Sequence, residues 1–299
     1  MTDIGGLNDH GFNHLAYIGL LRAEKELGVQ GRVLTSSTGA DYLPNLTTLA
    51  HGGYHLIIPV GFLMAQATDQ VAKGFPSSKF AMVDSDATAE PGDPKNIEGL
   101  LFEEQQAGYL AGYLSGLYAK SKGYKTISSV GGEKIPPVDH YIAGYIAGAK
   151  AASPKAKVLY GYSQDFVDQA KCKEVALNQI AQGSQVEFQV AGQCGLGALD
   201  AAKEKGGWGI GVDADQAYLG AHMLTSATKK VDAGVLRTIK MVNDGNFHGY
   251  GNTTFSVRAG GVGIGKISPK VPKAIVAQEK VLEKKLASGK VKGIPTTVP

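Results

Sequence analysis

The segment TISSVGGEKIPPVDHYIAGYIAGAKAASPKAKVLYGY, residues 126–162, contains the pattern that decides the fold. Two short apolar runs rich in β-branched residues, Thr126–Gly131 and Lys157–Tyr162, have the length and composition of buried strands. Between them, Val138–Ala152 carries apolar residues at helical spacing. A strand, a helix and a second strand joined by short loops form a parallel pair covered by the helix. The segment therefore predicts an α/β fold.

The same alternation extends in both directions along the chain. Further strands are predicted at His55–Val60, Lys79–Asp86, Asn96–Phe102, Val186–Gly192 and Trp208–Asp213. Further helices are predicted at Phe12–Leu27, Glu103–Ala119, Phe166–Ile180, Leu196–Glu204, Val231–Val242 and Val271–Leu286. The first helix has a capping pair, Asn8–Asp9, before it and a stop signal, Gly28, after it. Two such series, before and after about Glu103, predict two doubly wound lobes.

Composition narrows the classes of protein that fit. The 299 residues are 43% hydrophobic and 19% charged, which suits two packed domains rather than a disordered chain. No apolar run approaches the ~18–20 residues of a membrane-spanning helix. The net charge is only +3, and lysines are spread between acids along the sequence. This pattern does not predict a nucleic-acid partner, which would favour an arginine-rich stripe.

Polar residues follow several of the predicted strands. They are Asp3 with Gly5 and Gly6, Gly61-Phe62, Asp84 and Asp86, Gly192-Gln193, and Asp213 with Asp215. Any one of them can be a turn former or a helix cap. In an α/β protein, however, ligands bind outside the carboxyl ends of parallel strands, and a second lobe makes the cleft between lobes the natural site. Their repetition favours a polar binding cleft.

Catalytic and cofactor motifs are weak in this sequence. The run GGVGIGK at Gly260–Lys266 has phosphate-loop spacing, but Ile267 stands where that motif needs a hydroxyl. The pairs His10/His14 and His51/His55 lack the glutamate of a metalloprotease helix, and there is no Gly-x-Ser-x-Gly elbow. We expect no cofactor, metal or catalytic residue. A hydrolase that pairs Asp84 or Asp86 with Asp213 remains an alternative.

The two cysteines and two of the aromatic residues have positions that admit two interpretations. Cys172 lies early on a predicted helix and Cys194 lies in the turn after the next strand, where the two can meet as a disulfide or remain buried thiols. Phe12 and Phe166 are each expected at the start of a helix. Each is either a core residue or half of a sandwich for a flat ligand.

Several motifs in collinear order point to a family. DIGGLNDHGFN at Asp3–Asn13 resembles the opening signature of the basic membrane protein family, the purine-nucleoside-binding lipoproteins of bacterial ABC importers. The resemblance continues through FAMVDSD, EEQQAGYLAGYLSG at Glu103–Gly116, FVDQAKCKEVA, GVDADQ at Gly211–Gln216 and LTSATKKVD at Leu224–Asp232. It therefore covers nearly the whole chain.

The resemblance implies a fold and a binding mode. The fold would be that of periplasmic binding proteins of type I, with two parallel-sheet lobes, three crossovers and a ligand cleft between the lobes. Such a protein carries no catalysis and binds a purine nucleoside such as adenosine, guanosine or inosine. Phe12 and Phe166 would stack on the two faces of the base. Asp3 and Asn13 would hydrogen-bond its edge.

The ribose is implied to lie among acidic and basic side chains. Asp84, Asp213 and Lys229 would hold its hydroxyl groups, and Gly192 would allow a close approach of the backbone. Either Asp84 or Asp86 could face the cleft, and Asp84 is favoured because it ends the apolar run. An ionised Asp3 accepts hydrogen bonds but cannot donate one, which favours 6-oxopurines that carry an N1–H group over adenosine.

The resemblance also implies domain limits, a location and a partner. Residues 1–103 and 228–255 would form the first lobe, and residues 104–227 and 256–299 the second, with Gly260–Gly265 as hinge or crossover residues. The protein would be extracytoplasmic, lipid-anchored in its full-length precursor, and would deliver its ligand to an ABC permease. A sensor that signals to a membrane receptor is the alternative use of the same fold.

Overall fold

The computed structural model describes residues 1–299, which divide into two compact units. Unit 1 comprises Met1–Phe102 and Lys230–Phe255, and unit 2 comprises Glu103–Lys229 and Ser256–Pro299. The chain therefore passes from one unit to the other three times. None of the helices combines the length and apolar character needed to cross a bilayer.

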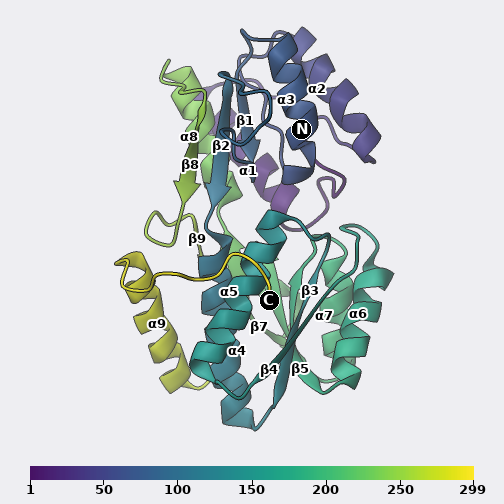
Figure 1. Cartoon of the computed structure of the whole chain (residues 1–299), viewed down its shortest axis with the longest axis vertical. Helices are drawn as coiled ribbons and strands as arrows, with labels where there is room; N and C mark the ends of the chain where they lie inside the picture. Colours follow the sequence, from purple (N-terminus) through teal and green to yellow (C-terminus); the bar gives the residue numbers. More distant parts are fainter. The chain divides into compact units, whose positions relative to one another are not determined.

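Unit 1 is built on a small parallel sheet with the strand order β1-β2-β8. Its strands are β1 (Phe80–Val83), β2 (Ile97–Phe102) and β8 (Gly251–Phe255). Its helices are α1 (Phe12–Leu27), α2 (Tyr42–His51), α3 (Ala65–Gly74) and α8 (Val231–Asn243), with short 3₁₀ turns at Gly39–Asp41 and Phe62–Met64. Helix α1 packs against α8, and α2 packs against α3 (Figure 1).

The predicted strand His55–Val60 is wrong for most of its length. Only Ile57 and Val60 make bridges, Ile57 with Phe80 in β1, and Val60 with Val83 and Thr2. Residues of this segment also line a cavity of about 810 Å³ within unit 1, together with residues of α1 and α8. A continuous strand needs backbone partners along its edges, and along this segment the pairing is limited to isolated bridges.

Unit 2 contains a larger sheet with the strand order β4-β3-β5-β6-β7-β9. Its strands are β3 (Thr126–Gly131), β4 (Lys157–Tyr162), β5 (Ser184–Val190), β6 (Trp208–Asp213), β7 (Met223–Lys229) and β9 (Val262–Ile264). Its helices are α4 (Glu104–Lys122), α5 (Pro136–Ala152), α6 (Gln169–Ala181), α7 (Gly195–Glu204) and α9 (Lys273–Ala287), with a 3₁₀ turn at Ala217–Leu219. All pairings are parallel except that of β9 with β7. Helix α4 packs on α5, and α6 packs on α7 (Figure 1).

Two expectations about unit 2 are corrected by the structure. The helix predicted from Phe166 begins only at Gln169, because the Asp168 carboxylate accepts a hydrogen bond from the Ala170 amide and caps the helix there. Phe166 therefore lies in a loop. The Gly260–Gly265 run is not a crossover, since Val262–Ile264 is strand β9 of the unit 2 sheet and the chain crosses at Phe255–Ser256.

Helices α4 and α5 approach so closely that only glycine fits at their contact. A methyl group on Gly108 would lie 2.1 Å from the Tyr141 carbonyl oxygen. One on Gly112 would lie 2.0 Å from the carbonyl oxygen of Tyr145. Two glycines of α5 face carbonyls of α4 in the same way. Backbone against backbone is therefore the packing that fixes this helix pair on the sheet.

We expect Gly112→Ala to lower the free energy of unfolding by roughly 1–3 kcal/mol, the usual cost of overpacking a core. Alanine is a better helix former than glycine, so propensity alone predicts the opposite sign. The control is Gly74→Ala in α3, where no atom lies within 4 Å of the added methyl group, and it should be neutral or stabilising. Urea titration of both variants tests this, and equal stabilities would contradict the packing.

Candidate functional site

The parallel strands of unit 2 end at one edge of its sheet. Strands β3, β5, β6 and β7 are consecutive neighbours, so the residues that end or follow them come together there. Those residues are Gly131-Gly132, Gly192, Asp213 and Lys229. Strands β4 and β5 lie on opposite sides of β3, which makes β3 the topological switch point of the sheet. In open α/β sheets, ligands bind at this point.

The Phe166 ring lies over the end of β3. It is partly exposed, and a methyl group on Gly132 would lie 2.3 Å from a ring carbon, so the ring rests directly on the backbone. The Phe166 carbonyl accepts a hydrogen bond of 3.0 Å from the Cys194 amide. Gly192, with a φ of 54°, passes 3.5 Å from that carbonyl, as measured from its added Cβ. The loops after β4 and β5 thus place an aromatic face at the switch point.

Asp213 ends β6 in a left-handed conformation, with a φ of 61°. Its side chain is mostly buried, and its Oδ1 atom accepts a hydrogen bond of 3.1 Å from the Tyr141 hydroxyl of α5. Aspartate tolerates this backbone region better than most residues. Such conformations often mark functional sites. The hydroxyl of Tyr141 orients the carboxylate, and sequence reasoning had no signal that paired these two residues.

Lys229 ends β7 and forms a buried ion pair with the first residue of α4. Its ammonium nitrogen lies 2.8 Å from Glu104 Oε1, and both side chains are almost fully buried. The other oxygen, Glu104 Oε2, lies 3.2 Å from His140 Nδ1. Burial by itself raises the pKa of the Glu104 carboxyl, but Lys229 and His140 outweigh it and hold that pKa below its ordinary value. The Glu104 carboxyl is therefore ionised at neutral pH and pairs with Lys229 at the strand end.

A corresponding edge exists in unit 1. Thr2, Val60 and Val83 are bridged side by side, and the residues that follow them are Asp3, Gly61 and Asp84. A methyl group on Gly61, whose φ is 124°, would lie 2.8 Å from Asp3 Oδ2 and 3.4 Å from the Phe12 ring. Glycine is therefore required where the Asp3 carboxylate and the Phe12 ring converge.

Asn13 connects Asp3 to Asp9, whose carboxylate binds the first amides of α1. Its side-chain amide donates to Asp3 Oδ1 at 2.7 Å and to Asp9 Oδ2 at 3.2 Å. The buried Asp9 carboxylate also accepts the backbone amides of Asn13 and His14, at 2.6 and 3.0 Å. The N-cap position of α1 is Gly11 rather than the predicted Asn8–Asp9 pair. Asp9, the second acid of the opening motif, nevertheless binds the first amides of the helix from two residues before that position and orients Asn13.

The two candidate acids of the FAMVDSD run differ in their surroundings. Asp84 follows β1 with a φ of 67° and is mostly buried, as is Asp213 at the end of β6. Asp86 Oδ1 accepts hydrogen bonds from the Thr88 amide and hydroxyl and from the side-chain amide of Asn252. The Asp86 carboxylate is thus held by its own turn and by Asn252 of β8.

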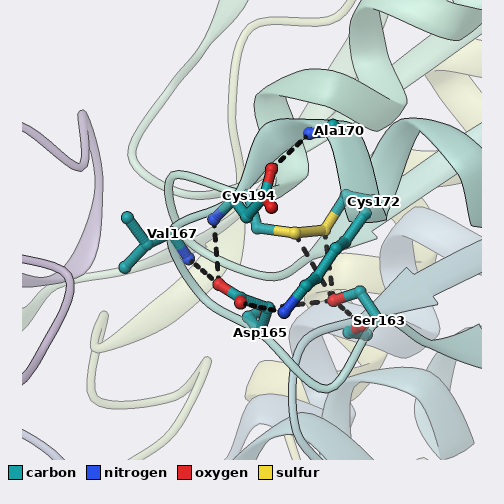
Figure 2. A network of polar contacts seen from close by, with 9 residues as sticks. Ser163, Asp165, Val167, Ala170, Cys172 and Cys194 are labelled. Atoms are coloured by element: carbon teal, nitrogen blue, oxygen red, sulfur yellow. Dashed lines mark hydrogen bonds and ion pairs between the residues drawn. A yellow bond between two sulfur atoms is a disulfide. The ribbon is translucent and has the colours of Figure 1, made fainter. Parts of the chain in front are cut away.

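Cys172 in α6 and Cys194 at the start of α7 are joined by a disulfide, with their Cα atoms 5.5 Å apart (Figure 2). The histidine pairs His10/His14 and His51/His55 belong to no cluster that could hold a metal, because no group of three or more His, Cys, Asp and Glu residues with that capacity exists. The strand-end edge of unit 2 thus carries Phe166, Asp213 and Lys229, and that of unit 1 carries Phe12, Asp3 and Asp84.

A solved structure with the same fold identifies the class of protein. A solute-binding protein of an ABC transporter system from Aeropyrum pernix K1 is 27% identical, covers 98% of this chain and 92% of its own, and superposes with a TM-score of 0.88. The structure therefore has the two-lobed fold of type I periplasmic binding proteins, as the sequence predicted.

Sequence comparison gives the family. The model of the Bmp family, PnrA-like substrate-binding proteins of ABC transporters, matches residues 1–295, and the chain belongs to this family. An uncharacterized lipoprotein of Pyrococcus horikoshii is 36% identical over 275 residues, 88% of this chain and 67% of that protein. The ABC transporter nucleoside-binding protein BmpA of Lactococcus lactis is 33% identical over 287 residues, 89% of this chain and 80% of that protein.

We expect Glu104→Gln to lower the free energy of unfolding by ~3–5 kcal/mol, because it removes one charge of a buried ion pair and leaves Lys229 undercompensated. Adding Lys229→Met should recover most of this loss. The control is Glu204→Gln, which breaks the exposed pair with Lys173 and should cost at most ~1 kcal/mol. Urea titrations at pH 7 measure all three, and a Glu104→Gln variant as stable as the control would contradict the account.

Proposed function

We propose that this substrate-binding protein takes a purine nucleoside as its ligand, with one aromatic ring contributed by each unit. Phe166 and Phe12 stack on the two faces of the base, and Asp3 and Asn13 bind its edge. The ribose hydroxyls are held by acids at the ends of strands and by Lys229. The protein delivers the nucleoside to an ABC permease and does not transform it.

The order of groups along the unit 2 sheet edge is the observation that carries this proposal. Phe166 lies over the end of β3, Asp213 ends β6 and Lys229 ends β7. Neighbouring strands are about 4.8 Å apart, so this row runs from an apolar face to a charged end over roughly 10–15 Å. A nucleoside has the same polarity, a flat base followed by a sugar whose hydroxyls need partners when buried.

Unit 1 supplies groups of matching chemistry. Phe12 is a second partly exposed ring, and Gly61 brings it beside the Asp3 carboxylate. Asp84 supports the ribose from the end of β1, with the same backbone conformation as Asp213. Gly192 lets a ligand atom approach the backbone without meeting a side chain.

The relatives support both the ligand and the location. One relative carries nucleoside binding in its name, and the Pyrococcus relative is named a lipoprotein. From these names we infer that this chain is an extracytoplasmic, lipid-anchored receptor, and we propose purine nucleosides as its ligands. The disulfide agrees with that location, because disulfides persist in oxidising compartments.

A thermal-shift screen of ligand-stripped protein tests the ligand class. Purine nucleosides should raise the melting temperature, since a ligand at ~100-fold excess over its Kd adds ~2.7 kcal/mol of stability. Pentoses, amino acids and pyrimidine nucleosides should not. Chromatography after incubation should return the nucleoside unchanged. A shift from a free sugar alone, or release of a free base, would contradict the proposal.

Loss of one ring should weaken nucleoside binding. Phe166→Ala is expected to cost ~1–3 kcal/mol, the scale of stacking on an aromatic side chain, and Phe166→Leu should cost less because it keeps apolar contact. The control, Tyr250→Ala, removes an aromatic ring that stacks on Lys95 within unit 1, and should leave affinity unchanged. Calorimetric titration with inosine measures this; equal affinities for Phe166→Ala and the control would refute the stacking.

The edge of the base should select 6-oxopurines. Asp3 Oδ1 already accepts hydrogen bonds from Asn13 and from the Gly5 amide, so the carboxylate serves as an acceptor. Inosine carries a donor at N1 and adenosine an acceptor, and an unpaired buried acceptor costs ~1–3 kcal/mol. We expect inosine to bind about 5- to 150-fold more tightly than adenosine, and Asp3→Asn to narrow that ratio of affinities. A preference for adenosine would exclude this arrangement.

A further inference from the structure

The loop that carries Phe166, residues 163–168, belongs to no helix or strand, yet it is tied at nearly every residue. Ser163 and Gln164 donate backbone hydrogen bonds of 2.9 and 3.1 Å to the carbonyls of Gly131 and Gly132. Gln164 has a left-handed φ of 56°. These contacts turn the chain back over the end of β3, where the Phe166 ring rests on Gly132.

The disulfide holds the loop from one side. The Cys194 amide donates to the Phe166 carbonyl at 3.0 Å, and Cys194 is bonded to Cys172 in the second turn of α6. The Ser163 hydroxyl oxygen lies 3.3 Å from Cys172 Sγ and 3.4 Å from Cys194 Sγ (Figure 2). Both sulfurs are fully buried. The bond thus links the start of α7, which holds the Phe166 backbone, to the helix that follows the loop.

Asp165 holds the loop from the other side. Its Oδ1 atom accepts the amides of Val167 and Asp168 at 2.7 and 2.8 Å, and its Oδ2 atom lies 2.7 Å from Lys171 Nζ (Figure 2). The hydrogen bond and charge of Lys171, with the two amides, lower the pKa of Asp165 to about 2. The carboxylate is therefore ionised at neutral pH and makes all of these contacts at once.

We propose that Cys172, Cys194 and Asp165 are positioning residues, which hold Phe166 in the place where its ring stacks on the ligand. None of the three needs to touch the ligand. The inference rests on the proposed function, because it names the groups that prepare the same site. A ring fixed before binding loses little freedom when the ligand arrives, whereas a mobile ring has to be ordered at the expense of affinity.

A double-mutant cycle tests the coupling between the disulfide and the ring. The four proteins are the parent, Cys172→Ala/Cys194→Ala, Phe166→Ala, and the variant with all three substitutions, each titrated with inosine. Removing the disulfide should weaken binding about 2- to 10-fold when Phe166 is present, the cost of ordering one side chain and its loop. It should have no effect in the Phe166→Ala background. Equal weakening in both backgrounds, or no weakening in either, overturns the proposal.

Hydrogen exchange without ligand gives a readout that does not depend on nucleoside binding. The amides of Val167 and Asp168 should exchange faster in the cysteine variant, while those of β6 keep their protection. If the parent fails to bind any nucleoside, the proposed function fails, and the exchange rates alone decide whether the disulfide orders the loop. Unchanged exchange at both amides would overturn the positioning role.

Asp165→Asn provides an independent variant in which the disulfide remains intact, should removal of the cysteines impair folding. It removes the charge that Lys171 pairs with and weakens the acceptor of both amides. We expect the same faster exchange in the loop and the same Phe166-dependent loss of affinity. The matched control is Glu204→Gln, which breaks an exposed ion pair elsewhere in unit 2. Equal loop exchange rates and equal inosine affinities for Asp165→Asn and this control would contradict the proposal.

Discussion

Parallel pairing of β3, β5, β6 and β7 is the constraint on which the candidate site depends. In a parallel sheet all carboxyl ends lie at one edge, so residues distant in sequence are collected into one row. Asp213 and Lys229 belong to that row because Asp213 is paired with Thr228 across β6 and β7. The loop that carries Phe166 places its ring over the end of β3, at the same edge. A change in the register of a single strand would separate these groups.

Burying charged groups at the sheet edge carries a desolvation cost, which neighbouring opposite charges offset. Lys229 is almost fully buried, and it is compensated by Glu104 at the start of α4, which His140 supports in turn. Helix α4 can deliver this carboxylate because its glycines let it approach α5 at backbone distance. The packing of α4 against α5 therefore also places the Glu104 carboxylate beside Lys229. A bulkier residue at Gly112 would move both helices and their polar groups together.

The sequence alone was sufficient to predict the bounds of elements that have a clear local pattern of apolar residues. Strands β3, β4 and β6 and helix α1 have the bounds that the sequence pattern predicted, because each is a run of apolar or periodic residues bounded by turn or cap signals. Strand β7 was missed as a strand, since its sequence MLTSATK is half polar although every residue is buried. Backbone pairing with β6 on one side and β9 on the other holds β7 as a strand, although its composition does not predict one.

The site was predictable only in part, for related reasons. Acids after strands are visible in a sequence, and family motifs named the two rings. Phe166 lies in a loop because the Asp168 cap starts α6 at Gln169, whereas periodicity alone predicts a start at Phe166. The partners of Lys229 and Asp213 are contacts across 125 and 72 residues. Short-range patterns contain no information about such pairs.

The most direct measurement is a crystal structure of the protein with inosine bound. The account predicts the base stacked on Phe166, with the centroids of the two ring systems about 4.5–7 Å apart. It also predicts ribose hydroxyl oxygens about 2.5–3.0 Å from the Asp213 carboxylate. Inosine bound in the cavity of unit 1, or with its base remote from Phe166, would contradict the claim that the strand-end row is the nucleoside site.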